Sequence, residues 1–163
     1  MVQALVLHVE DDSDDAFFVA KAFRKAQVAC EIRRMKNGLE AVDYLGQAAT
    51  CANPDCYPVP NVVLLDLKLP DVSGFEVLQW GRAQTSLQRL PIVILSGSPV
   101  QEDQQRARQL GADAYFVKSP DYADVIAFVG RILHVECAQN VSPQPAANHA
   151  AVLGSAIGKR TSL

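Results

Sequence analysis

Four short apolar runs recur along the chain, and each is followed by polar residues and then by a helical pattern. Runs that are apolar throughout are typical of strands buried on both faces of a parallel sheet. Cys30–Met35 is a weaker fifth run, in which Arg33 and Arg34 favour a place nearer the sheet edge. The sequence therefore predicts five strands, the four strong ones being Ala4–Val9, Val62–Leu65, Ile92–Leu95 and Ala114–Val117.

Amphipathic helix patterns lie between the predicted strands. Apolar residues recur at i, i+3, i+4 and i+7 from Ala16 to Phe23, and the same spacing returns between Tyr122 and Leu133. Capping-box spacings and a Ser-Pro pair mark the starts of further helices. These signals are Asn37 with Glu40, Ser73 with Glu76, and Ser98-Pro99 with Gln101. With the two amphipathic patterns, they predict helices starting near residues 13, 37, 73, 98 and 119. Gly111 fits a helix end. Strict alternation of strand and helix predicts a doubly wound α/β sandwich with helices on both faces of a parallel sheet.

Composition narrows the function classes. The chain has 163 residues and a net charge of −3, without the basic stripe that phosphate-backbone binding needs, so no direct nucleic-acid partner is expected. No apolar run reaches the roughly 18 residues of a spanning helix, and no signal peptide is evident, so we expect a cytoplasmic protein without membrane contact. The irregularly spaced cysteines, Cys30, Cys51, Cys56 and Cys137, predict free thiols.

Charge divides the chain near residue 137. All of the acidic residues lie in 1–137. The only charged residues in 138–163 are Lys159 and Arg160, and this segment is rich in Ala, Ser, Gln, Asn and Pro. We expect one domain over 1–137 and a flexible tail over 138–163, with a short docking helix from about Ala146 to Ile157 as the alternative.

A proline-rich segment, Ala48–Pro60, separates the second helix from the third strand. Cys51 and Cys56 lie in it, but zinc sites usually need a tighter cysteine pair and a second pair elsewhere. A variable surface loop is therefore the better interpretation.

Polar side chains follow the carboxyl ends of the strands, where ligands bind in open α/β sheets. The first strand runs into Glu10-Asp11-Asp12, the third into Asp66, the fourth into Ser96 and the fifth into Lys118. Each residue alone has a structural explanation, such as a solvated helix start, a cap or a surface lysine. Together, these carboxylates, a hydroxyl and an ammonium predict a Mg²⁺-assisted phosphoryl site.

These residues resemble the receiver domains of two-component response regulators over about residues 1–135. The resemblance implies a flavodoxin-like (βα)5 fold with strand order 2-1-3-4-5. The long loop before the third strand and Lys118-Ser119-Pro120 resemble the single-domain regulators paired with bacterial phytochrome histidine kinases. The motifs are Val9-Glu10-Asp11-Asp12, Leu64-Leu65-Asp66-Leu67-Lys68-Leu69-Pro70-Asp71 with Gly74, Ile94-Leu95-Ser96-Gly97, and Gly111-Ala112-Asp113-Ala114-Tyr115-Phe116-Val117-Lys118.

The resemblance also implies site roles. Asp66 would accept a phosphoryl group from a histidine kinase or a phosphotransfer protein, and Lys118 would pair with a phosphoryl oxygen. Ser96 would hydrogen-bond the phosphoryl group, and Tyr115 would be the switch aromatic that signals to an unknown downstream protein, with homodimerisation left open. The Mg²⁺ ligands would be Glu10, Asp11, Asp66 and the backbone carbonyl of Lys68.

Two other functions use the same fold. A Mg²⁺-dependent phosphatase or hydrolase could use Asp66 as its nucleophile, but Lys68 stands where a second carboxylate would serve as acid or base. Nucleotide or flavin binding would need a Gly-rich phosphate loop, and the chain has no Gly-x-Gly.

Ser119 departs from the receiver pattern, which usually has proline after the lysine. A cis bond before a non-proline residue costs about 2.5–4 kcal/mol, so we predict a trans Lys118–Ser119 peptide. We further predict that Lys118 still reaches Asp66 through its flexible stem, and that Ser119 caps the last helix with Pro120 at its first position.

Overall fold

The structure, a computed structural model, describes residues 3–50, 55 and 57–139. These residues form a five-stranded parallel sheet in the order β2-β1-β3-β4-β5, as predicted. The elements in chain order are β1 (Ala4–Val9), α1 (Ser13–Lys25), β2 (Cys30–Met35), α2 (Gly38–Thr50), β3 (Val62–Leu65), α3 (Gly74–Ala83), the 3-10 helix η1 (Thr85–Leu87), β4 (Ile92–Ser96), α4 (Gln101–Gln109), β5 (Ala114–Val117) and α5 (Ala123–Gln139).

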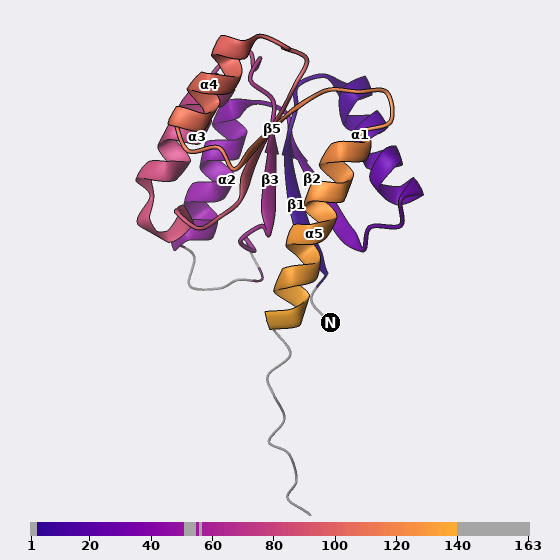
Figure 1. Ribbon diagram of the computed structural model, residues 1–163. Coiled ribbons are helices and arrows are strands. Elements are labelled where there is room, and N and C mark those ends of the chain that lie inside the picture. The colour runs from indigo at the N-terminus through magenta and orange to yellow at the C-terminus, as the bar shows by residue number, and fades with distance from the viewer. Residues whose placement is uncertain (1–2, 51–54, 56, 140–163) are drawn as a thin grey trace, which may run out of the picture.

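Helices cover both faces of the sheet (Figure 1): α1 and α5 lie on one face, and α2, α3 and α4 lie on the other. Alternate residues of β1 pack into the hydrophobic cores on the two faces of the sheet, because successive side chains of a strand point to opposite faces. Leu7 belongs to the core cluster that includes α2 and α3, and Val6 belongs to the cluster that includes α1 and α5. β3 is buried along its whole length, which explains its unbroken apolar sequence.

Three helix starts agree with the sequence signals. α1 begins at Ser13 behind the N-cap Asp12, α2 begins at Gly38, and α3 begins at Gly74 behind a complete capping box between Ser73 and Glu76. Asn37 accepts a hydrogen bond from the backbone N–H of Glu40 at 2.7 Å. Gly111 ends α4 with φ of +93°, a conformation that favours glycine.

Two predicted helix starts are wrong. α4 begins at Gln101 behind Val100, which provides no side-chain cap; Ser98 instead donates its hydroxyl to Asp103 Oδ2 at 2.6 Å. Pro99 favours extended backbone at Ser98, which delays the helix.

α5 begins at Ala123 rather than near residue 119, so Ser119 is not its cap and Pro120 is not its first residue. Ser119 Oγ instead accepts from the backbone N–H of Tyr122 at 3.2 Å and closes a turn in which Tyr122 has φ of +54°.

Some predictions fall beyond the residues that the structure describes. They concern Cys51, Cys56, the side chain of Cys137, the part of the predicted tail 138–163 beyond Gln139, and the docking helix at Ala146–Ile157. Cys30 is a free thiol. Within residues 3–50, 55 and 57–139, no helix is both long and apolar enough to span a bilayer.

Candidate functional site

The acidic residues of the site follow β1 and β3, two neighbouring inner strands of the sheet. β1 and β3 pair directly, with Val9 opposite Leu65, and the backbone N–H of Asp66 donates to the carbonyl of Val9 at 3.1 Å. The backbone N–H of Glu10 donates to the carbonyl of Met35 at 2.9 Å. The ladder hydrogen bonds therefore continue past the strand ends and fix the backbone of Glu10 and Asp66.

Gly74 allows the start of α3 to pack closely against the backbone of Asp66. A Cβ on Gly74 would lie 2.1 Å from the carbonyl oxygen of Asp66, so a larger residue would push α3 away from the end of β3. The glycine of the sequence motif is therefore required by close backbone approach.

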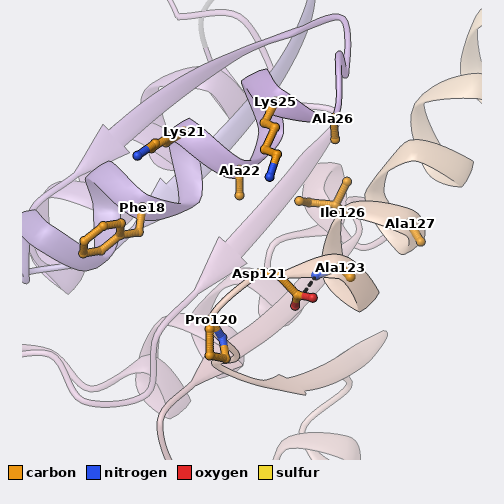
Figure 2. Close-up of a pocket in the computed structure, with 10 residues that line it drawn as sticks. All are labelled: Phe18, Lys21, Ala22, Lys25, Ala26, Pro120, Asp121, Ala123, Ile126 and Ala127. Atoms are coloured by element: carbon orange, nitrogen blue, oxygen red, sulfur yellow. Dashed lines mark hydrogen bonds between the residues drawn. The ribbon is translucent and has the colours of Figure 1, made fainter.

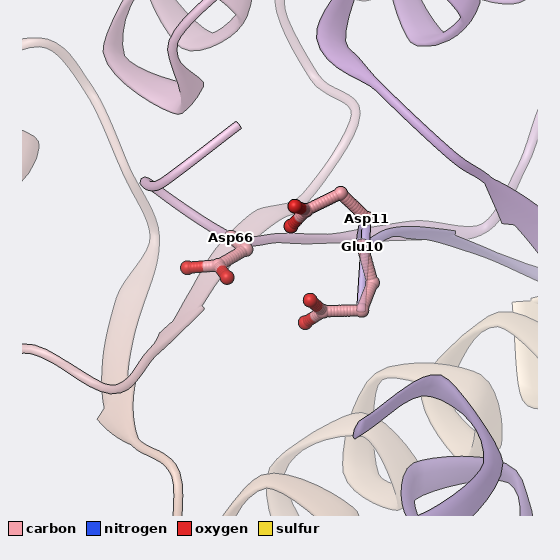
Figure 3. Close-up of side chains that lie close together, drawn as sticks. All are labelled: Glu10, Asp11 and Asp66. Carbon is pink, nitrogen blue, oxygen red and sulfur yellow. The ribbon is translucent and has the colours of Figure 1, made fainter. Parts of the chain in front are cut away.

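Glu10, Asp11 and Asp66 form the predicted carboxylate cluster. Each offers an oxygen, and these oxygens all lie within 4.8 Å of one another. Figure 3 shows the three side chains close together. Glu10 and Asp66 are buried and Asp11 is exposed, and burial raises the pKa of Glu10 above its ordinary value. Hard oxygen ligands on a partly open site suit a divalent cation such as Mg²⁺, so the residues present fit the predicted metal. The carbonyl ligand from Lys68 stays a prediction.

Lys118 reaches the carboxylates as predicted. Its Nζ lies 2.7 Å from Glu10 Oε2, 2.7 Å from Asp15 Oδ2 and 3.0 Å from Asp66 Oδ2. Burial alone would lower the pKa of Lys118, but the hydrogen bonds to the three carboxylates raise it above its ordinary value. The Lys118–Ser119 peptide is trans, which confirms that a cis bond is not needed to aim the ammonium.

Two residues of this region were missed in the sequence. Asp15, taken only as part of an acidic helix start, binds Lys118. Arg34, taken only as a sign of an edge strand, donates to the carbonyl of Glu10 at 2.9 Å and to that of Asp11 at 2.7 Å. The position of Asp15, three residues after the N-cap of α1, could have indicated its role. Nothing in the sequence indicated the role of Arg34.

Ser96 is the last residue of β4, and Tyr115 is the second residue of β5. Ser96 is fully buried, its Oγ accepts from the backbone N–H of Ser98 at 3.4 Å, and its carbonyl accepts from the backbone N–H of Lys118 at 2.9 Å. The half-buried Tyr115 donates its hydroxyl to the carbonyl of Ser98 at 2.8 Å. The structure thus joins the two predicted switch residues through Ser98.

His8 is a buried polar residue below the acidic site. Neither of its ring nitrogens has a hydrogen-bond partner, and burial, with help from the charges of Lys118 and Arg34, lowers its pKa to about 3. A neutral imidazole without partners costs stability, typically about 1–3 kcal/mol for an unsatisfied buried polar group.

A groove of about 680 Å³ lies between α1 and the start of α5 (Figure 2). Phe18 and Lys21 line it from α1, and Pro120 and Ile126 line it from the other side. None of the predicted site residues lines this groove. The chemistry therefore belongs to the carboxyl end of the sheet and not to this groove.

A (βα)5 sheet with an acidic cluster and a lysine at its carboxyl end is the arrangement that the sequence motifs predicted. The family model described as "Response regulator receiver domain" matches residues 6–129, and the chain belongs to this family. It is therefore a receiver domain of the response regulators, a family of signalling proteins whose partner is a histidine kinase.

The relatives support this family. The probable methanogenesis regulatory protein FilR2 of Methanothrix harundinacea is 31% identical over 142 residues, which cover 87% of this chain and 89% of that protein. Response regulator Rcp1 of Synechocystis is 31% identical over 125 residues, which cover 77% of this chain and 83% of that protein.

Solved structures agree with the fold. The Mn²⁺-bound form of Rcp1 has a TM-score of 0.66 at 29% identity and covers 88% of this chain and 99% of its own. The phosphorylated cyanobacterial phytochrome response regulator RcpA has a TM-score of 0.68 at 29% identity and covers 88% of this chain and 100% of its own. These relatives give no support to a hydrolase or a nucleotide-binding protein.

Proposed function

We propose that Asp66 accepts a phosphoryl group from a phosphohistidine, with Glu10, Asp11, Asp66 and the carbonyl of Lys68 as ligands of Mg²⁺. One observation carries the proposal: the ammonium of Lys118 lies 3.0 Å from Asp66 Oδ2 beside a group of three carboxylates. A nucleophilic carboxylate flanked by a cation and by metal ligands is what phosphoryl transfer requires, since the reaction depends mainly on positioning and charge neutralisation.

The residues of the site share the steps of this reaction. An oxygen of Asp66 forms the new bond to phosphorus, while the phosphorus–nitrogen bond of the donor breaks and the imidazole leaves with its electron pair. Lys118 pairs with a phosphoryl oxygen, and the hydroxyl of Ser96 donates a hydrogen bond to another. A bound Mg²⁺ would neutralise the charge that gathers on the phosphoryl oxygens.

The same residues assist loss of the phosphoryl group to water. The resulting signal is a change of surface at α4, β5 and α5, where Tyr115 would follow Ser96 when Ser96 binds the phosphoryl group. A downstream protein, or a second copy of this chain, would bind that surface.

A phytochrome-type histidine kinase is the donor that we propose. Support comes from RcpA, which is a phytochrome response regulator. A phosphotransfer protein is the alternative donor, and the two differ in a simple transfer assay: an autophosphorylated phytochrome kinase should pass its label to Asp66 within minutes without any third protein.

The proposal is tested with acetyl phosphate and Mg²⁺, read by intact mass. The wild type should retain one phosphoryl group, whereas a hydrolase would consume acetyl phosphate continuously. Asp66→Asn should retain none, while Asp43→Asn, the same change at an exposed position on α2, should behave like the wild type. Equal labelling of Asp66→Asn would exclude Asp66 as the acceptor.

A further inference from the structure

Lys118 has one carboxylate partner outside the acidic cluster. Its Nζ binds Glu10 and Asp66, which belong to the cluster, and also Asp15 Oδ2 at 2.7 Å, which does not. Asp15 lies on α1, and with a side-chain exposure of 37% it is the most exposed of the three partners. Asp15 is also absent from the set of residues that the receiver resemblance implies.

The ammonium and a metal ion would compete for the same oxygens. Glu10 Oε2 and Asp66 Oδ2 accept from Lys118, while Glu10 Oε1 accepts from the backbone N–H of Asp12 at 3.1 Å and Asp66 Oδ1 accepts from that of Lys68 at 3.3 Å. Every oxygen of these two carboxylates therefore already has a donor. A cation that joins them is repelled by the ammonium and gains most when the ammonium is drawn elsewhere.

We propose that Asp15 is a positioning residue for the metal: it draws the ammonium of Lys118 toward α1 and thereby leaves oxygens of Glu10 and Asp66 to the cation. The inference rests on the proposed metal site. Once Glu10 and Asp66 serve the cation, Asp15 is the carboxylate that still holds Lys118 in place for a phosphoryl oxygen. Asp15 acts through Lys118 and touches neither the metal nor the phosphoryl group.

Asp15→Asn is the direct test, read as Mg²⁺ affinity by calorimetric titration of the full chain. Without the Asp15 charge, Lys118 binds Glu10 and Asp66 more closely, and Mg²⁺ binding should weaken by at least about threefold, as expected for coupled residues of one ion-pair network. Asp14→Asn is the matched control, because it removes the same charge from the preceding, exposed residue. The control should weaken Mg²⁺ binding clearly less; equal weakening by the two variants would overturn the proposal.

A double-mutant cycle separates action through Lys118 from a direct effect. In a Lys118→Met background, Asp15→Asn should leave the Mg²⁺ affinity almost unchanged, because the ammonium that Asp15 draws away is absent. A full Asp15→Asn effect in that background would overturn the proposal. Should Lys118→Met fail to fold, Asp15→Glu replaces it: restored carboxylate charge should recover most of the lost affinity, and no recovery would contradict the proposal.

The phosphorylation test keeps this proposal distinct from the proposed function. If the wild type binds Mg²⁺ and labels at Asp66 but Asp15→Asn titrates like the wild type, only the role of Asp15 fails. If the wild type binds no Mg²⁺, the metal site fails and the role of Asp15 fails with it.

Discussion

The two halves of the site are built differently. The acidic half is formed by Glu10 and Asp11 after β1, Asp66 after β3 and Lys118 after β5, and its ion pairs measure 2.7–3.0 Å. The switch half is formed by Ser96 at the end of β4, Ser98 just after it and Tyr115 within the edge strand β5. There the hydrogen bonds from Ser98 N to Ser96 Oγ and from Val100 N to Ser98 Oγ both measure 3.4 Å, beyond the usual 2.7–3.2 Å.

The contacts that hold each half indicate which half can move with the smaller loss of free energy. Arg34, Lys118 and the continued ladder hydrogen bonds all hold the acidic half, whereas α4 begins at Gln101 without a side-chain cap. A rearrangement on phosphorylation would therefore break ion pairs in the acidic half, but only hydrogen bonds without an ion pair in the switch half. We therefore expect the acidic half to stay in place on phosphorylation and the switch half to move.

The largest expected effect comes from Lys118→Met, which removes the cation of the acidic half. Two buried carboxylates lose their counter-charge, and the free energy of unfolding without Mg²⁺ should fall by about 3 kcal/mol, since breaking a buried ion pair leaves an uncompensated charge. Added Mg²⁺ should restore part of this loss. Urea denaturation with and without Mg²⁺ measures both values, and a variant that Mg²⁺ stabilises no more than the wild type would contradict the assignment of the metal ligands.

His8→Leu should change the pH dependence of stability. The pKa of His8 lies near 3 in the folded chain and near 6.5 in the unfolded chain, so only the unfolded chain binds the proton as the pH falls below about 6.5. The wild type should therefore lose about 2 kcal/mol more than the variant between pH 6.5 and pH 5.

The same comparison at pH 7 provides a second check. The variant should also be about 1–3 kcal/mol more stable there, because two unpaired buried nitrogens are gone. Urea denaturation at several pH values measures the free energy of unfolding of both proteins. If this free energy depended on pH in the same way for both, the predicted low pKa of a buried, unpaired His8 would be wrong.

The sequence predicts the strands and the acidic half well, for physical reasons. Fully buried strands must be apolar throughout, so Val62–Leu65 is unmistakable, and the polar residue that follows such a strand must lie at the edge where ligands bind. Asp66, Glu10 and Lys118 are thus located by strand ends alone, and the structure brings them together.

The caps of the last two helices and the role of Arg34 could not be predicted from local sequence patterns. Whether Ser98 or Ser119 caps a helix depends on competing partners, and Asp103 and the turn at Tyr122 decide against both. The role of Arg34 depends on the register between β1 and β2, which sets His8 opposite Arg34 and which no local pattern specifies.

Asp11→Ala tests how far the acidic half depends on its one exposed carboxylate. Removal of a direct ligand should weaken Mg²⁺ binding by at least about tenfold, because even outer partners of metal ligands commonly contribute that much. Stability without the metal should hardly change, as Asp11 is exposed. Calorimetric titration beside the Asp14→Asn control measures this, and an unchanged affinity would remove Asp11 from the ligand set.

Tyr115→Phe should have the smallest effect and decides whether the two halves are independent in the unphosphorylated chain. The variant keeps the ring against the core but loses the hydroxyl that donates to the carbonyl of Ser98 at 2.8 Å. The free energy of unfolding should fall by about 1 kcal/mol, the usual net value of one hydrogen bond. The Mg²⁺ affinity should stay that of the wild type, because no ligand of the acidic half contacts this hydroxyl. If Tyr115→Phe weakened Mg²⁺ binding as much as Asp11→Ala, the switch half would hold the acidic half in place, and the division between a fixed and a movable half would be wrong.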